Sequence, residues 1–149
     1  MMTGALAAAA VLLAATVFGL LRRRRDGVLR ARRRGGDDEV DEILRRDDVG
    51  AELGERATLL QFSSAFCAPC RATRRVLGEV AEMVEGVAHV EIDAESRLDL
   101  VRRLNVVRTP TVFVLDAEGR IVRRATGAPR KPDVIAALGA AVDGGDRSA

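Results

Sequence analysis

The chain has 149 residues, of which 48% are hydrophobic and 31% are charged, with a formal net charge of +2. This length suits one compact domain with appendages, and this composition excludes a collagen-like chain or one disordered over most of its length. Tryptophan and tyrosine are absent and phenylalanine occurs only 4 times, so the core has to be mainly aliphatic.

The first predicted element is a transmembrane helix over residues 4–21, preceded by a short tail at residues 1–3. The segment GALAAAAVLLAATVFGLL has 18 residues without a charge. As a helix rising about 1.5 Å per residue it reaches about 27 Å, close to the hydrocarbon thickness of a bilayer. A cleaved signal peptide carries basic residues before its apolar run, whereas here the arginines follow it. An uncleaved anchor is therefore favoured over a cleaved signal with an unusual start and over a buried alanine-rich helix.

A basic block follows the apolar run, with arginines at positions 22–25, 30 and 32–34, and an acidic run follows at residues 37–42. Because basic flanks stay on the cytoplasmic side, the block predicts an N-terminus outside the cell and a cytoplasmic domain. No stacking aromatic residues are interleaved with the arginines, so contact with anionic lipid is favoured and nucleic-acid binding is not expected.

The rest of the chain divides into a juxtamembrane linker at residues 22–55, a domain at residues 56–142 and a flexible tail at residues 143–149. Within the linker, Val40, Ile43 and Leu44 could form one short amphipathic helix. Apolar spacing and turn residues predict the domain's elements in chain order: a strand at 57–62, a helix at 67–85, a strand at 89–93, a short helix near 98–104, a hairpin of strands at 111–116 and 121–127, and a helix from 132 to about 142. Strand, helix, strand and helix in succession indicate a parallel βαβ arrangement.

The chemistry is expected at Cys67 and Cys70, the only two cysteines, which are three residues apart in FCAPCR. Cys67 follows a predicted strand and opens a predicted helix, where unpaired N–H groups and the helix dipole favour thiolate over thiol. Cys70 comes nearly one helical turn later, where its sulfur can reach that of Cys67 and resolve a mixed disulfide. Pro69 fits the first helical turn, and Ala68 is small enough to let a partner approach.

Other interpretations of this pair stay open. Half of a zinc site would need further ligands, and beyond the two cysteines the chain offers only His89. A purely structural disulfide is a second alternative, although closing a loop of four residues constrains the unfolded chain little. His89 is assigned to surface or packing, Asp93, Asp116 and Glu118 are assigned to strand ends and a turn, and no metal site is predicted. Arg71 is assigned to a solvated helix face, with support of the thiolate as the alternative.

The order of these motifs resembles the thioredoxin family: a strand, FCAPCR at a helix start, then RTPT before a hairpin and a terminal helix. The resemblance covers about residues 57–142 and implies a thioredoxin-like α/β fold with a central mixed sheet flanked by helices. It further implies that Cys67 attacks, that Cys70 resolves, and that Pro110 is a cis-proline facing the site. The backbone of Thr109 would then pair with an extended substrate segment.

Two residues depart from the family pattern. Phe66 stands in place of a tryptophan before the first cysteine, which keeps an apolar contact but loses the indole N–H. Gln61 stands in place of a buried acid, and an amide can neither accept nor release a proton. Deprotonation of Cys70 would then depend on water or on another side chain, so the rate and the redox poise stay open.

The expected function is thiol-disulfide exchange, with the chain acting as an enzyme that reduces protein disulfides in the cytoplasm while tethered to the membrane. The expected partners are client proteins with disulfides and an upstream dithiol or disulfide that exchanges electrons with the pair, and no cofactor is expected. One alternative keeps this chemistry with the domain on the extracytoplasmic side. Another is a non-catalytic module that binds a protein partner through the same fold.

Overall fold

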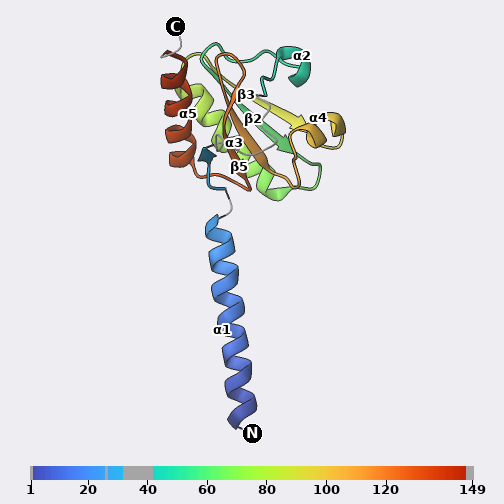
Figure 1. Cartoon of the computed structure of the whole chain (residues 1–149), viewed down its shortest axis with the longest axis vertical. Coiled ribbons are helices and arrows are strands. Elements are labelled where there is room, and N and C mark those ends of the chain that lie inside the picture. The colour runs from blue at the N-terminus through green and yellow to red at the C-terminus, as the bar shows by residue number, and fades with distance from the viewer. Residues whose placement is uncertain (1, 26, 32–41, 147–149) are drawn as a thin grey trace.

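The computed structural model describes residues 2–25, 27–31 and 42–146. Its elements in chain order are α1 (Met2–Arg25), β1 (Arg30–Ala31), α2 (Arg46–Val49), β2 (Ala57–Ser63), α3 (Ala68–Met83), β3 (Val87–Asp93), α4 (Leu98–Arg103), β4 (Thr111–Asp116), β5 (Ile121–Thr126) and α5 (Lys131–Asp146). Figure 1 shows α1 projecting from one end of a compact α/β unit that contains the other elements. The arrangement confirms the predicted mixed sheet flanked by helices.

The sheet has the strand order β1-β5-β4-β2-β3. β2 and β3 are parallel, and the other neighbouring pairs are antiparallel. The predicted βαβ unit is therefore present as β2, α3 and β3, and the predicted hairpin is present as β4 and β5. β1 has only two residues and was not predicted, because so short a segment carries no alternation of apolar and polar residues.

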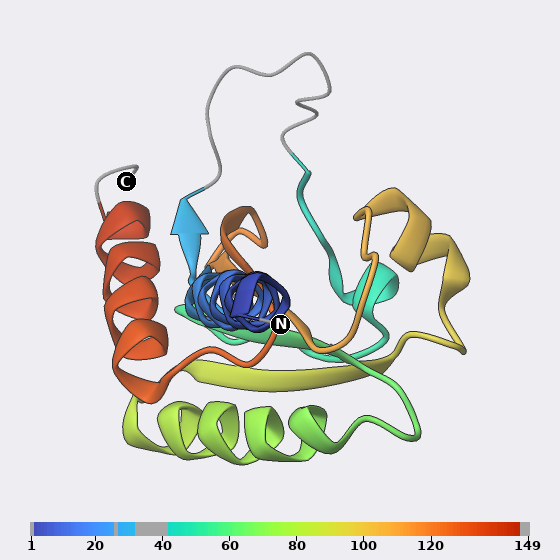
Figure 2. The same cartoon turned by 90° about the horizontal axis from the view of Figure 1, so that it is seen from below.

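Side chains of the inner strand β2, which lies between β4 and β3, alternate between two apolar layers, as the two-residue period of a strand requires. Leu59 packs with α3 and α5 on one face of the sheet, whereas Leu60 and Phe62 pack with α4 on the other. Figure 2 shows α3 running along one side of the strands and α4 lying on the other side. Seven consecutive positions of β2 are buried, so the strand that leads to Cys67 is held on both faces.

The packed domain begins before residue 56, where the sequence pattern placed its start. Leu44 is 0% exposed and Val49 is 5% exposed, both within the apolar layer that contains Phe62. The Leu44 N–H donates to the Gly119 carbonyl oxygen at 2.9 Å, and Ile43 forms an isolated bridge with Arg120. The expected helix at Val40 to Leu44 is not present at residues 43 and 44, and Val40 lies outside the described residues. Leu44 and Val49 lie five positions apart in a charged segment and give no periodic apolar pattern. Only the tertiary contacts show that both are buried.

Both ends of the chain are helical for longer than predicted. The expected span at residues 4–21 falls within α1, which continues through the first arginines to Arg25. Of the helices in the described part of the chain, none has the combined length and apolarity needed to cross a membrane. α5 continues to Asp146, so the expected tail at residues 143–149 begins inside a helix, and residues 147–149 lie outside the described residues.

Candidate active site

The two cysteines lie at the start of α3, just after the loop that follows β2. Cys67 is the N-cap residue of α3, Pro69 occupies the first turn, and the two sulfurs form a disulfide with the Cα atoms 5.2 Å apart. The backbone N–H of Cys70 donates to the Cys67 sulfur at 3.2 Å. When the pair is reduced, this N–H and the positive end of the helix dipole favour the thiolate form of Cys67. The predicted placement of Cys67 at a helix start is confirmed.

The two cysteines differ in exposure, and this difference suggests which sulfur reacts first with a client. Cys67 is half-buried, whereas Cys70 is only 2% exposed. A client sulfur can therefore approach Cys67 from solvent, while Cys70 is placed to react with Cys67 from beneath.

Around the cysteines, Ala68 and Pro69 are exposed, as an approach surface requires. The Phe66 side chain is fully exposed at 101%, so the apolar contact expected for it is not made within the described part of the domain. A fully exposed phenyl ring is available to a partner and adds nothing to the core.

The loop that ends at Pro110, just before β4, contacts the loop between β2 and α3 that carries Cys67. The Thr109–Pro110 peptide bond is cis, as the family resemblance implies. The hydroxyl of Thr109 lies 2.9 Å from that of Ser64, in the loop that carries the cysteines. The carbonyl oxygen of Pro110 accepts from the Gly127 N–H at 2.7 Å, which fixes this loop to the end of β5. The Pro110 loop is thus linked to the cysteine loop through Ser64 and to the end of β5 through Gly127.

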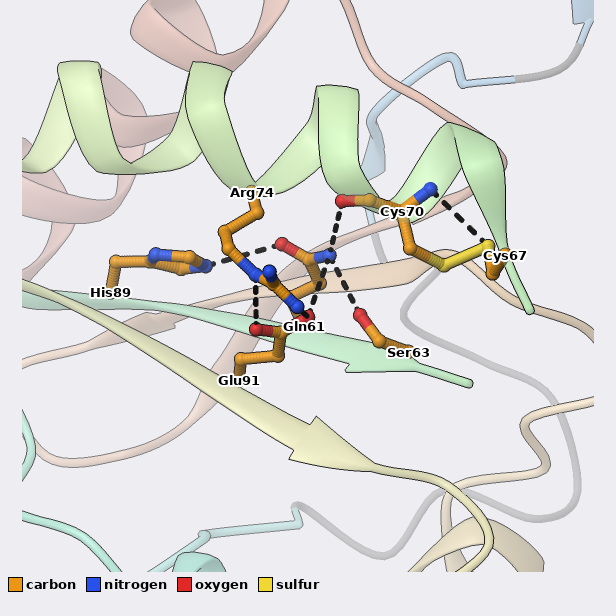
Figure 3. Close-up of polar contacts among 7 residues, drawn as sticks. All are labelled: Gln61, Ser63, Cys67, Cys70, Arg74, His89 and Glu91. Atoms are coloured by element: carbon orange, nitrogen blue, oxygen red, sulfur yellow. Dashed lines mark hydrogen bonds and ion pairs between the residues drawn. A yellow bond between two sulfur atoms is a disulfide. The ribbon is translucent and has the colours of Figure 1, made fainter. Parts of the chain in front are cut away.

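Beneath the disulfide, the buried amide of Gln61 forms the centre of a hydrogen-bond network (Figure 3). Its Nε2 donates to the Ser63 hydroxyl at 2.8 Å and to the Cys70 carbonyl oxygen at 3.0 Å. Its Oε1 lies 3.2 Å from the Nε2 of His89, on the neighbouring strand β3. Gln61 is 0% exposed, so these partners satisfy polar groups that burial would otherwise leave unpaired. The amide holds the backbone of Cys70 and takes no proton from it.

An ion pair closes one side of the same network. Arg74 on α3 donates from Nε to Oε2 of Glu91 at 2.5 Å and from Nη2 to Oε1 at 2.8 Å. Burial alone would raise the pKa of the Glu91 carboxyl, but hydrogen bonds from Arg74 and Ser63 outweigh it, and the net shift is downward. Glu91, Arg74 and both cysteines line one hollow of about 420 Å³. The resolving sulfur of Cys70 therefore borders a hollow next to this ion pair.

Burial lowers the pKa of His89 below its ordinary 6.5; the charge of Glu91 raises it in part, and that of Arg74 lowers it again. Because the unfolded chain then takes up this proton at a higher pH than the folded chain does, the free energy of unfolding should fall as the pH decreases below about 6.5. His89→Gln, which keeps a partner for Gln61, should flatten that fall. The measurement is urea unfolding between about pH 7.5 and pH 5.5, a window above the titration of Glu91. An unchanged slope would show that His89 is not the group responsible.

Of the predicted site residues, Cys67 and Cys70 are joined in a disulfide, and Thr109, next to the cis-Pro110, contacts Ser64 of the cysteine loop. Phe66, Ala68 and Pro69 are exposed in or next to that loop. Sequence reasoning missed a second group of residues around the cysteines: Ser63, Ser64, Arg74, His89 and Glu91. Only the parallel register of β2 with β3, which pairs Gln61 with Glu91, reveals it. Arg71 is exposed and lines the hollow, and the residues that the structure describes contain no His, Cys, Asp and Glu cluster suited to a metal ion.

Comparison with known proteins supports the same family and fold. The family model described as a thioredoxin-like domain matches residues 48–142. Thioredoxin H2 of Arabidopsis thaliana is 31% identical over 72 residues, which are 48% of this chain and 53% of that protein. Thioredoxin domain-containing protein 2 of Homo sapiens is 30% identical over 86 residues, which are 56% of this chain and 16% of that protein. The matched regions thus span about half of the first relative's length and a smaller share of the second's.

A solved structure extends the likeness to the backbone. A mutant thioredoxin from Halobacterium salinarum NRC-1 superposes with a TM-score of 0.56 at 22% identity, covering 64% of this chain and 81% of that chain. At that identity the likeness concerns the fold alone.

Proposed function

The chain belongs to the family of thioredoxin-like domains, and from this premise we propose that it reduces protein disulfides through Cys67 and Cys70. The observation that carries the proposal is the pairing of a half-buried Cys67 at the start of α3 with a covered Cys70 that is 2% exposed. A nucleophile open to a client and a resolving thiol beneath it are the two parts that disulfide exchange needs.

In the proposed reaction the reduced protein uses two thiols and transfers two electrons. The Cys67 thiolate attacks one sulfur of the client disulfide, whose S–S bond breaks, and the released client thiolate takes up a proton. Cys70 then loses its proton through the hollow beside Glu91 and attacks the Cys67 sulfur. This breaks the mixed disulfide, frees the second client thiol and leaves the Cys67–Cys70 disulfide. An upstream dithiol returns the pair to its reduced form.

The residues around the sulfurs have distinct roles in this proposal. The backbone of Thr109, beside Pro110, pairs with an extended client segment. The exposed ring of Phe66 contacts apolar client side chains. Ala68 and Pro69 leave the approach to Cys67 open, because neither places a large or charged side chain over it.

The direction of electron flow is tested by the reduction potential of the pair, measured by equilibration of the full chain with glutathione buffers. A reductant should have a potential near that of thioredoxin itself, about −270 mV, because about 30 mV corresponds to a difference of about 1.4 kcal/mol for a two-electron couple. A value near −120 mV, typical of a strong oxidant, would contradict the reductant proposal and favour an extracytoplasmic role.

A membrane tether is the second part of the proposal, with residues 4–21 spanning the bilayer, the arginine block at the anionic headgroups and the domain in the cytoplasm. Two features support it. α1 extends away from the domain (Figure 1). Among the side chains of α1 that the structure describes, the large apolar ones are each at least 51% exposed: Val11, Leu12, Leu13, Val17, Phe18, Leu20 and Leu21. An apolar surface of this kind calls for a partner. No helix of the described part meets the length and apolarity needed to cross a membrane, so the proposal of a bilayer rests on the uncharged run of residues 4–21 and on the arginines that follow it.

Topology is tested by adding protease to intact and to permeabilised bacterial spheroplasts that express the full chain. The domain should resist cleavage until the membrane is permeabilised. Cleavage in intact spheroplasts would reverse the topology. Recovery of the full chain in the fraction that does not sediment with membranes would refute the tether.

A further inference from the structure

The point where the chain leaves α1 is built into the sheet next to the active site. The N–H of Gly27 donates to the carbonyl oxygen of Thr126, the last residue of β5, at 2.8 Å. Thr126 pairs with Thr111 of β4, and Thr111 pairs with Phe62 of β2. These four residues form one row across the sheet. With strands about 4.8 Å apart, Gly27 lies about 14 Å from Phe62 in the strand that leads to Cys67.

The same end of the sheet carries both loops of the active site. β2 runs toward this end and continues into the cysteine loop, and β4 starts from it directly after Pro110. The Gly127 N–H binds the Pro110 carbonyl oxygen at 2.7 Å, one residue beyond the partner of Gly27. Figure 1 shows the start of α3 at the end of the domain from which α1 emerges. The dithiol and Gly27, which we call the root of α1, therefore lie at the same end of the domain.

Gly27, the root of α1, is fitted closely into the domain. Gly27 is buried and has φ +78°, and a Cβ atom there would lie 2.1 Å from the Ala128 carbonyl oxygen. A positive φ and such a close backbone approach both require glycine. Only one residue separates this root from the end of α1, and two Cα steps span at most about 7.6 Å. The edge of the domain at Gly27, which lies at the same end of the sheet as the dithiol, therefore stays within a short distance of the end of α1.

We propose that the clients of the dithiol are disulfides held close to the membrane surface, such as a cysteine pair just outside the transmembrane segment of a membrane protein. This inference rests on the proposed exchange activity and on the proposed tether, and it adds the location of the client. Reduction follows the same two exchange steps, with both electrons supplied by the thiols of Cys67 and Cys70. Tethering raises the effective concentration of a client disulfide only when the disulfide lies within the reach of the anchored domain.

The test places the full chain in vesicles of phosphatidylcholine with about one fifth phosphatidylglycerol, together with a single-span peptide that carries an intramolecular disulfide. In one peptide a spacer of about 3 residues separates the disulfide from the membrane span, and in the other a Gly/Ser spacer of about 30 residues does so. The near disulfide should be reduced at least about tenfold faster than the far one, because the far disulfide spends most of its time beyond the site.

A matched pair of insertions tests the role of the root. About 20 Gly and Ser residues placed after Arg25 would give the domain a mean reach of about 25 Å and should reduce the near-to-far rate ratio to about one. The same insertion after Asp146, which leaves the root intact, should preserve the ratio. Equal rates for both peptides with the unmodified chain would overturn the inference, as would a preference that survives insertion after Arg25.

Two further readouts separate failure of this inference from failure of the proposed function. Flotation of the chain with the vesicles reports the tether, and reduction of a soluble disulfide such as insulin reports the exchange activity. If either is lost, the proposed function is wrong. If both are present and the near-to-far ratio is one, the function stands and the membrane-facing site is wrong.

Discussion

Cys70→Ser is expected to accumulate covalent adducts on Cys67 with client proteins, whereas the unmodified chain should show almost none at steady state. The variant keeps the nucleophile at the start of α3, so the first exchange step still forms a mixed disulfide. It lacks the thiol that resolves this intermediate, and a serine hydroxyl is not acidic enough to replace it. The adducts are measured by non-reducing gel electrophoresis after acid quenching, and mass spectrometry of the bands would identify the clients.

Cys67→Ser is the matched control for this trap. It should lower the rate of insulin reduction at least about a thousandfold and yield no adducts, because the remaining thiol is 2% exposed and cannot reach a client. Adducts of equal abundance in both variants would contradict the assigned order of attack. If Cys67→Ser also left the cellular role of the protein intact, a non-catalytic binding module would be the better description.

Phe62→Ala should lower the free energy of unfolding by about 3–5 kcal/mol, a large share of the 5–15 kcal/mol typical of a domain. Phe62 is 0% exposed and packs edge-on against Phe113, with ring centroids 5.8 Å apart. Truncation removes this contact and leaves a cavity beside the strand that carries the cysteine loop. Urea unfolding of the full chain, followed by circular dichroism, measures the change.

Phe66→Ala provides the comparison, since it makes the same substitution at a ring that is 101% exposed. It should change the free energy of unfolding by less than about 0.5 kcal/mol. It should also slow reduction of a protein client, because the proposed contact is with the client and not with the core. Equal destabilisation by the two substitutions would show that the Phe66 ring packs against the domain.

Local patterns were sufficient where a feature depends on neighbouring residues. The start of α3 at Ala68, with Cys67 as its cap, follows from a strand followed by a helical apolar spacing and an early Pro69. The parallel pairing of β2 with β3 follows from the intervening helix, because such a crossover returns the chain in the same direction. The family resemblance, and not the spacing, indicated the cis bond before Pro110.

Other features depended on pairings between distant segments and could not be predicted from the sequence pattern. Val49 and Leu44 have charged neighbours in sequence, yet the fold buries them against residues more than ten positions away. His89 was assigned to surface or packing, and only the neighbouring position of β3 brings its ring to Gln61. Phe66 was expected to make an apolar contact, but the path of the loop directs its ring into solvent.

The sequence by itself determined the reacting pair, its position at a helix start and the family, because spacing along one helix turn places two sulfurs together whatever the rest of the chain does. It also determined an apolar run of 18 residues ahead of an arginine block. Tertiary structure alone decided what surrounds the pair, namely the Gln61 network, the converging Pro110 loop and the root at Gly27. Gln61 and His89 lie on different strands, and Gly27 and Thr126 lie near opposite ends of the chain, so hydrogen bonds across the sheet place them and no local pattern of residues encodes the contact.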